Sequence, residues 1–258
     1  MIEKIKKKRK FLYTSKDLAI IVPTKDRPEK IERLLNSIVS LDCKIGRLII
    51  VASGQDIENI IANFKKKIPI EYLKSEPGQI KQRNKGINLL NKSTKLVATI
   101  DDDVIFKYKT VSEIIKFWNK VEPDTAGVGF NIVNLPAHRH TFIRGLFGLS
   151  EVEPGRVLKS GLVTSITNVK KNIRTEWLTG GATVWRQDIL KNYTHKEVQS
   201  QWAVGEDLIF SYPIGKKFPL YICCEAKLEV EELELVNLSI KHHIFRGKTQ
   251  YLWFLYFI

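Results

Sequence analysis

Short apolar runs alternate with helical stripes along the first part of the chain. Runs rich in β-branched residues have the composition of buried strands, at 18–22, 47–51, 69–73 and 95–100. Between them, apolar residues three or four positions apart predict helices at 28–38, 57–64 and 79–90. We expect the first strand to end at Pro23 and Pro28 to lie in the first helical turn, where proline is tolerated. This alternation predicts a parallel sheet with crossover helices.

The second half of the chain is less regular. Its pattern predicts strands at 125–133, 182–185 and 220–224, and a helix that begins at Glu206. Residues 134–155 read as one long loop, which in a compact domain is usually functional or mobile. We expect the choice of any acceptor substrate to depend on residues 134–161.

Polar residues follow three of the predicted strands, at Pro23–Thr24, Ser53–Gly54 and Asp101–Asp103. Ligands of parallel α/β sheets bind beyond the carboxyl ends of the strands. The Asp101–Asp103 triplet is the strongest feature, because three adjacent carboxylates repel one another unless a cation or hydrogen-bond donors compensate them. In an extended segment Asp101 and Asp103 would point the same way, able to bind Mg²⁺ or Mn²⁺ together with diphosphate oxygens. The alternative is a solvated acidic turn or a cluster that caps a helix.

Two further groups of residues could carry chemistry near a helix start. Glu206 and Asp207 are either caps of the helix that they open or a source of a general base. Gln79, Arg83 and Asn84 share a helix edge that could reach a nucleotide or a diphosphate, or that could be a solvated basic face.

Two more groups lie later in the chain. Gly180 and Gly181 permit close backbone approach and Trp177 offers a stacking face for a sugar, unless the segment is a plain turn beside a core tryptophan. His243 could ligate a metal and Arg246 could bind phosphate, unless both are surface residues.

Composition narrows the class of protein. With 258 residues, 43% hydrophobic and 27% charged, the chain is typical of globular proteins. Its 42 Lys and Arg against 28 Asp and Glu give a net charge of +14, which favours an anionic partner such as a nucleotide, a phosphorylated lipid or an acidic membrane. Three cysteines without a C-x-x-C pair argue against a disulfide framework and a zinc site. No signal peptide or apolar run of spanning length is apparent, so we expect a cytoplasmic protein.

Taken in order, the motifs resemble those of family 2 glycosyltransferases with the GT-A fold, over about residues 17–250. The matching segments are Pro23–Arg27, Gly78–Gly86, Ile100–Asp103, Trp177–Ala182, Gly205–Asp207 and His243–Arg246. The resemblance implies an α/β, Rossmann-like fold with a mostly parallel central sheet and flanking helices. It also implies one catalytic domain over 17–250, with a nucleotide-binding half at 17–104 and an acceptor half at 105–250. Residues 1–16 would be a basic lead-in, and 251–258 the start of an apolar C-terminal helix.

The activity implied by the resemblance is a metal-dependent, inverting sugar transfer from a nucleotide diphosphate donor, of the kind used in bacterial surface glycan synthesis. Asp207 would match the family's base, beside Glu206. Asp101 and Asp103 would match its D-x-D motif, with Asp103, assisted by Asp101 and His243, holding Mg²⁺ or Mn²⁺. The nucleotide-sugar would lie against Pro23, Thr24, Asp26, Arg27, Ser53, Gln79, Arg83, Asn84, Asp101 and Asp102, and the acceptor or sugar against Trp177, Gly180, Gly181 and Arg246.

The second strand departs from the family pattern. It lacks the aspartate that usually follows it and contacts the nucleotide base, so Ser53 or Asp26 would have to substitute. Two other classes of function would require different sequence features. A nucleotidyltransferase should carry a glycine-rich loop after the first strand, and residues 23–27 contain no glycine. A nucleic-acid-binding protein should show a basic stripe interleaved with aromatics, whereas the lysines here are dispersed and the sharpest motif is acidic.

The expected partners are a nucleotide-diphospho-sugar donor and a saccharide or lipid-linked acceptor, with no nucleic acid. The basic residues at 4–10 and the aromatic octet at 251–258 both suit an anionic membrane surface. The alternative is a disordered basic tail and a terminal helix that packs on the core.

Overall fold

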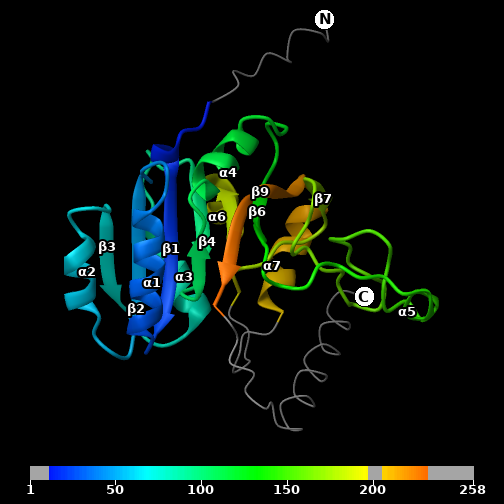
Figure 1. Cartoon of the computed structure of the whole chain (residues 1–258), viewed down its shortest axis with the longest axis horizontal. Coiled ribbons are helices and arrows are strands. Elements are labelled where there is room, and N and C mark those ends of the chain that lie inside the picture. The colour runs from blue at the N-terminus through cyan, green and yellow to red at the C-terminus, as the bar shows by residue number, and fades with distance from the viewer. Residues whose placement is uncertain (1–11, 197–204, 232–258) are drawn as a thin grey trace, which may run out of the picture.

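Four parallel strands form one half of a nine-stranded sheet in the computed structural model of the chain, which describes residues 12–196 and 205–231 (Figure 1). They are β1 (Leu18–Lys25), β2 (Arg47–Ser53), β3 (Ile70–Lys74) and β4 (Leu96–Ile100), in the spatial order β3-β2-β1-β4. The predicted parallel arrangement of these strands is confirmed.

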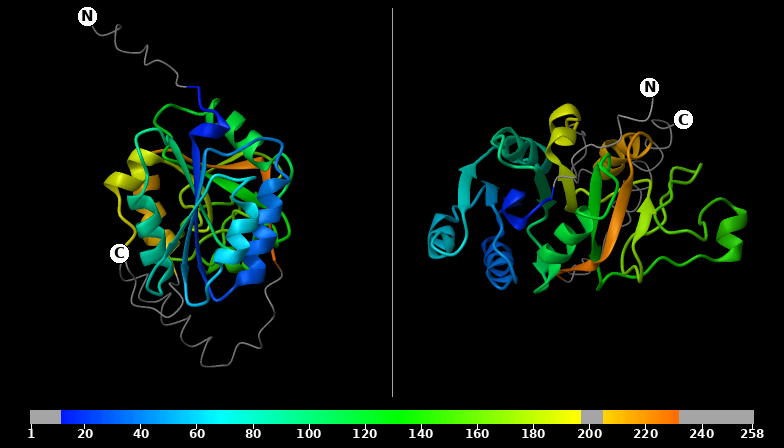
Figure 2. Two further views of the ribbon diagram at one scale, coloured as in Figure 1. Left: turned by 90° about the vertical axis from the view of Figure 1, so that its left-hand side faces the viewer. Right: turned by 90° about the horizontal axis from the view of Figure 1, so that it is seen from above.

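Helices cover both faces of the sheet (Figure 2). The side chains of β1 alternate between two cores, as the two-residue period of a strand requires. Leu18 and Ile20 pack in the core beneath α1 (Pro28–Val39), α2 (Glu58–Phe64) and α4 (Thr110–Trp118). Ala19 and Ile21 pack in the core beneath α3 (Gln79–Asn88), α6 (Gln187–Asn192) and α7 (Glu206–Gly215). The chain therefore forms three layers, with helices on each side of the sheet.

The second half of the sheet is mixed. Strand β8 (Ala182–Arg186) pairs antiparallel with β4, and β6 (Gly127–Ile132) pairs antiparallel with β8. Strand β9 (Leu220–Val230) runs parallel to β6 and pairs antiparallel with β5 (Val104–Phe106) and β7 (Ile173–Thr175). Short elements such as β5 and β7 carry too few residues to show a period in the sequence.

Three predictions about the boundaries of elements are wrong. The strand predicted at 220–224 continues to Val230 as β9. Strand β1 continues through Pro23 to Lys25, because β4 pairs with β1 only as far as Ile21, and the missing N–H of Pro23 therefore interrupts no ladder on that side. The predicted loop at 134–155 contains a short helix, α5 (Phe142–Leu146). No helix within the described ranges is long and apolar enough to cross a bilayer.

Candidate active site

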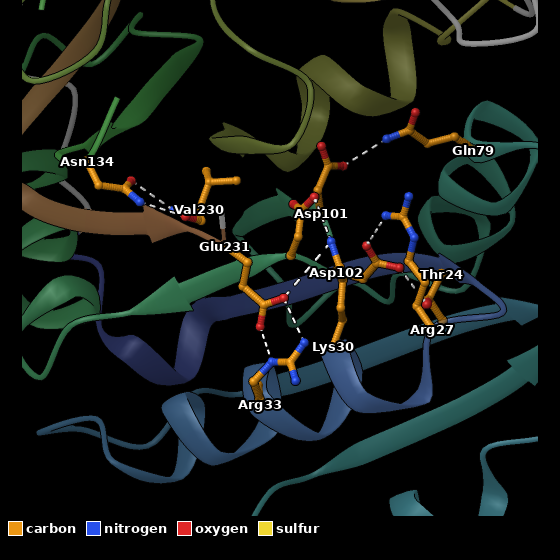
Figure 3. Close-up of polar contacts among 11 residues, drawn as sticks. Thr24, Arg27, Lys30, Arg33, Gln79, Asp101, Asp102, Asn134, Val230 and Glu231 are labelled. Atoms are coloured by element: carbon orange, nitrogen blue, oxygen red, sulfur yellow. Dashed lines mark hydrogen bonds and ion pairs between the residues drawn. The ribbon is translucent and has the colours of Figure 1, made fainter. Parts of the chain in front are cut away.

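The Asp101–Asp103 triplet lies in a turn between β4 and β5, so the predicted extended backbone is wrong here. The three side chains therefore have different partners, and Figure 3 shows those of Asp101 and Asp102. Asp102 points to the carboxyl end of β1, where its Oδ2 accepts a hydrogen bond from Thr24 Oγ1 at 2.7 Å and its Oδ1 accepts one from Arg27 Nη1 at 2.9 Å. Asp102 is 5% exposed, and this burial raises its pKa. It fixes the turn against β1 and the start of α1.

Asp101 faces the opposite side, toward α3. Its Oδ1 accepts a hydrogen bond from Gln79 Nε2 at 2.8 Å and lies 3.6 Å from Arg83 Nη2. Its backbone N–H donates to the carbonyl of Gly181 at 3.0 Å, which ties the turn to the segment before β8. Although 37% of its side-chain surface stays exposed, desolvation by the surrounding protein raises the pKa of Asp101 to about 6.

Asp103 is held through its backbone and faces α1 with its side chain. Its carbonyl accepts a hydrogen bond from the N–H of Glu231 at 2.8 Å, and its Oδ2 lies 3.6 Å from Lys30 Nζ. Glu231 in turn pairs with Arg33, whose Nη2 donates to Oε2 at 2.9 Å (Figure 3). Glu231, which follows β9, and Lys30 of α1 thus both contact Asp103.

Two glycines allow a second carboxylate to approach the triplet. A Cβ atom on Gly181 would lie 1.9 Å from Asp101 Oδ2, and one on Gly180 would lie 2.5 Å from Asp207 Oδ1. Any larger residue at either position would collide with these carboxylates. The carboxylates of Asp101 and Asp207 therefore pack closely against the backbone of the glycine pair, and the predicted approach of a sugar to this pair stays a prediction.

Asp207 is in an environment that disfavours its charge. Burial raises its pKa to about 7, and the neighbouring charge of Glu206 adds to this increase. The positive charge of Arg83 and a hydrogen bond from the backbone of Gly180 act in the opposite direction. A carboxyl group that titrates near neutral pH can accept a proton and later release it.

A fully buried arginine links the two sides of this cluster. Arg83 is 0% exposed; its Nη1 donates to Glu206 Oε1 and its Nη2 faces Asp101. Although burial lowers the pKa of Arg83, Glu206 and Asp101 raise it above its ordinary value. The alternative of a solvated basic face is therefore wrong for Arg83, because this charge is buried and compensated by two carboxylates.

His195 is a further buried residue beside Glu206. It is 3% exposed, its ring stacks on Phe210 with centroids 3.6 Å apart, and its Nδ1 lies 3.9 Å from Glu206 Oε2. Burial and the charge of Arg83 lower its pKa well below the usual value, so the ring is neutral. The backbone carbonyl of His195 accepts a hydrogen bond from Asn84 Nδ2 at 2.9 Å.

Sequence reasoning missed two polar residues in this region. Gln82 is 2% exposed and its Nε2 donates to the carbonyls of Thr24 and Val51, joining α3 to β1 and β2. Its place on the buried side of the predicted helix could have indicated that Gln82 makes buried hydrogen bonds. His195 carried no signal, because it follows the last turn of α6 in a segment without periodicity.

The other predicted nucleotide-binding residues differ in their access to a ligand. Pro23 is buried and Ser53 is 4% exposed, whereas Asp26 is exposed directly after the carboxyl end of β1. The Oδ1 of Asp26 accepts a hydrogen bond from the N–H of Gln55 at 2.7 Å, which bridges the ends of β1 and β2. Of the two proposed substitutes for the missing aspartate, Asp26 is the accessible one.

On the acceptor side, Trp177 is partly buried and its Nε1 donates to the carbonyl of Thr164 at 3.3 Å. His243 and Arg246, like the basic residues at 4–10 and the octet at 251–258, lie outside the described residues. Their predicted roles stay predictions.

The carboxylates fit a divalent metal by their chemistry, since Mg²⁺ and Mn²⁺ prefer oxygen ligands. Among residues 12–196 and 205–231, no group of three or more His, Cys, Asp or Glu side chains is arranged to hold a metal ion by itself. A metal at this site would therefore need further oxygen ligands, such as those of a diphosphate.

The chain is similar to known glycosyltransferases in sequence and in fold. The profile of the family described as Glycosyl transferase family 2 matches residues 19–193. No curated protein sequence matches the chain. Among solved structures, S. aureus TarS 1-349 in complex with UDP-GlcNAc is similar with a TM-score of 0.59 and 16% identity, over 86% of this chain and 61% of that one.

A second similar structure is the mannosyltransferase PcManGT from Pyrobaculum calidifontis in complex with GDP-Man and Mn²⁺. Its TM-score is 0.57 at 13% identity, over 92% of this chain and 62% of that one. The chain thus spans about three fifths of the length of these two proteins, and the likeness, at such low identity, is one of fold. The GT-A fold expected from the sequence is confirmed.

Proposed function

The chain belongs to glycosyl transferase family 2, and we propose that it transfers a sugar from a nucleotide diphosphate donor to an acceptor hydroxyl with inversion at the anomeric carbon. Family and fold support sugar transfer as such. One observation carries the inverting mechanism: Asp207 and the Asp101–Asp103 turn meet across Gly180–Gly181. A base and the carboxylates that face the donor then lie on the two sides of one narrow turn.

In the proposed reaction Asp207 accepts the proton of the acceptor hydroxyl. The acceptor oxygen forms a bond to the anomeric carbon of the donor sugar as the bond from that carbon to the diphosphate oxygen breaks. The electron pair of the broken bond leaves with the nucleoside diphosphate. Because the displacement is direct, no covalent sugar–enzyme intermediate forms and the configuration inverts. General base catalysis of this kind contributes about 10²- to 10⁴-fold.

Asp103, together with Asp101, would hold Mg²⁺ or Mn²⁺. When bound, the ion offsets the negative charge that develops on the leaving diphosphate. The exposed Asp26 and Arg27, at the end of β1, are the best-placed residues to contact the nucleotide. Gln79 is exposed beside Asp101 and can reach the diphosphate from the first turn of α3.

Glu206 and Arg83 act as positioning residues in this proposal. Glu206 is 6% exposed and paired with Arg83, so it is not placed to meet an acceptor. The pair instead sets the start of α7, on which Asp207 stands. We assign the acceptor to the saccharide or lipid-linked class, and the reaction to surface glycan synthesis of bacterial type.

Release of nucleoside diphosphate tests the proposed function. Full-length protein is incubated with UDP-GlcNAc, GDP-mannose or dTDP-linked sugars and a panel of saccharide and lipid-linked acceptors, with Mg²⁺, Mn²⁺ or chelator. We expect acceptor-dependent release from at least one donor, lost with chelator, and a product of inverted anomeric configuration. Retention of configuration would contradict the mechanism. Pyrophosphate release from a nucleoside triphosphate and a sugar phosphate would indicate nucleotidyl transfer instead.

The triplet offers a matched comparison of two neighbouring aspartates. We expect Asp103→Ala to abolish metal-dependent donor binding with little change in stability, because the ion pair of its side chain within the described part of the chain is a long one, to Lys30 at 3.6 Å. We expect Asp102→Ala to lower the free energy of unfolding by about 1–3 kcal/mol, because it leaves the buried Thr24 hydroxyl and the Arg27 guanidinium without this partner, while metal-dependent binding persists. Calorimetry of donor with Mn²⁺ and denaturant unfolding measure the two effects. Equal loss of binding at both positions would refute the assignment of Asp103.

A further inference from the structure

The segment after β6 exposes an unusual concentration of large apolar side chains. Seven of the eleven large hydrophobic residues that are exposed among the described residues fall between 142 and 163. Phe142, Ile143, Leu146 and Phe147 are between 70% and 81% exposed. Monomeric proteins rarely expose contiguous apolar patches of this kind without a partner.

These four residues form one face, here called the α5 face. In a helix, positions i, i+1, i+4 and i+5 lie on the same side, and α5 with its C-cap residue Phe147 places its apolar residues at that spacing. Figures 1 and 2 show α5 at the far end of the molecule, away from the sheet. The α5 face therefore belongs to neither core.

Internal contacts hold the segment that carries the α5 face. The N–H of Leu149 donates to the carbonyl of Arg144 at 2.8 Å, and the Nε2 of His138 contacts the carbonyl of Glu151 at 2.7 Å. Ser160 Oγ donates to the carbonyl of Gly148 at 2.8 Å. The apolar side chains thus project from a structured loop.

The charged residues of the segment that carries the α5 face are basic as far as residue 150. From residue 125 to residue 150 the sequence contains no Asp or Glu, and its charged residues are Arg139 and Arg144, with two histidines beside them. Both arginines are exposed, and neither pairs with a carboxylate among the described residues. The acidic residues that follow, Glu151 and Glu153, face Arg156 at 3.9 and 4.0 Å.

We propose that the α5 face docks on an anionic lipid bilayer, with its apolar side chains inserted among the lipids and Arg139 and Arg144 at the phosphate headgroups. An apolar face flanked by basic residues is the pattern of helices that lie in a membrane interface. A second copy of the chain fits less well. A symmetric interface would bring the arginines of the two copies together, and their charges would repel.

The first residue of the segment, Asn134, connects it to the proposed metal site. Asn134, where the segment leaves the sheet, accepts a hydrogen bond from the N–H of Val230 and donates to its carbonyl, and the next residue, Glu231, binds the carbonyl of Asp103 (Figure 3). The docked segment would begin beside the proposed metal ligand. A lipid-linked acceptor could then reach the site from the bilayer; this consequence rests on the proposed function, whereas the docking itself does not.

Vesicle co-sedimentation of the full-length protein tests the docking. We expect binding to mixed phosphatidylcholine–phosphatidylglycerol vesicles that exceeds binding to phosphatidylcholine alone and weakens at high salt. Phe142→Ser/Phe147→Ser should weaken binding roughly tenfold or more. Arg139→Ser/Arg144→Ser should weaken it about fivefold per arginine on the anionic vesicles.

Matched controls separate the α5 face from general stickiness and charge. Tyr108→Ser removes an aromatic residue that is 63% exposed elsewhere, and Lys65→Ser/Lys66→Ser removes two exposed charges after α2. Both should bind as wild type does, and circular dichroism should show all variants folded. No vesicle binding by the wild type, equal binding by the α5 variants, or a dimer that the Phe142→Ser/Phe147→Ser variant dissociates would each overturn the proposal. Failure of sugar transfer with intact vesicle binding would instead count against the proposed function.

Discussion

Asp207→Asn is expected to reduce sugar transfer by about 10²- to 10⁴-fold while donor binding and the fold persist. The amide is nearly isosteric with the carboxyl group and can still accept the hydrogen bond from Gly180, but it cannot take up a proton at neutral pH. Initial rates of nucleoside diphosphate release, with donor binding measured by calorimetry, give the two quantities. A variant with near wild-type turnover would remove Asp207 as the base.

The pH dependence of the wild type provides an independent check. Because burial raises the pKa of Asp207 to about 7, the carboxyl group is ionised above that pH and protonated below it. Transfer should therefore fall as pH drops below about 7 and level off above it. The Asp207→Asn variant should lose this dependence.

Stability should change in the opposite direction from activity. A carboxyl group whose pKa is raised on folding destabilises the fold once pH exceeds its unfolded value, and the effect grows until pH passes the folded pKa of about 7. At pH 8, Asp207→Asn should therefore unfold at a higher temperature than the wild type. A suitable control is Asp188→Asn, which changes an exposed aspartate that also lies in a first helical turn but pairs with Arg186. It should leave transfer unchanged.

The sheet could be predicted from the sequence where the pattern is strong. The apolar runs of β1 to β4 and the helical stripes of α1 to α3 predict a parallel sheet, and the pairing of β1 to β4 confirms it. The spatial order of these strands was not predicted, because local pattern does not specify which strands are neighbours. Helix α5 was not predicted, because five residues are too few for a helical period to stand out from a loop. Strand β5 is too short to show a pattern.

The candidate site was predicted by residue type but not by contact. Sequence reasoning selected Arg83 and Glu206 separately, with one on a helix edge and the other at a helix start. Their ion pair joins residues 123 positions apart, and no local signal reports a contact of that range. The triplet shows the same limit, because the turn that separates the directions of Asp101 and Asp102 depends on Thr24, Arg27 and the segment before β8.

Arg83→Met should be the most destabilising single change in the site. The substitution keeps much of the side-chain volume but leaves Glu206, which is 6% exposed, without its partner. Breaking a buried pair by removing one member costs about 3–5 kcal/mol, whereas an exposed pair is worth about 0–1 kcal/mol. Arg47→Met, which breaks a pair with the 47% exposed Glu71, is the matched control. Denaturant unfolding at pH 8 measures both.

A double variant and the pH dependence identify why Arg83→Met loses stability. Arg83→Met/Glu206→Gln removes the uncompensated charge and should recover part of the stability. Because Arg83 lowers the pKa of Asp207 and of Asp101, its removal should raise both values and shift the transfer profile to higher pH, which a merely structural defect would not do. The destabilisation should also grow with pH, as the carboxylates ionise without compensation. Loss of less than about 1 kcal/mol with an unshifted profile would show that Arg83 neither compensates Glu206 nor tunes Asp207.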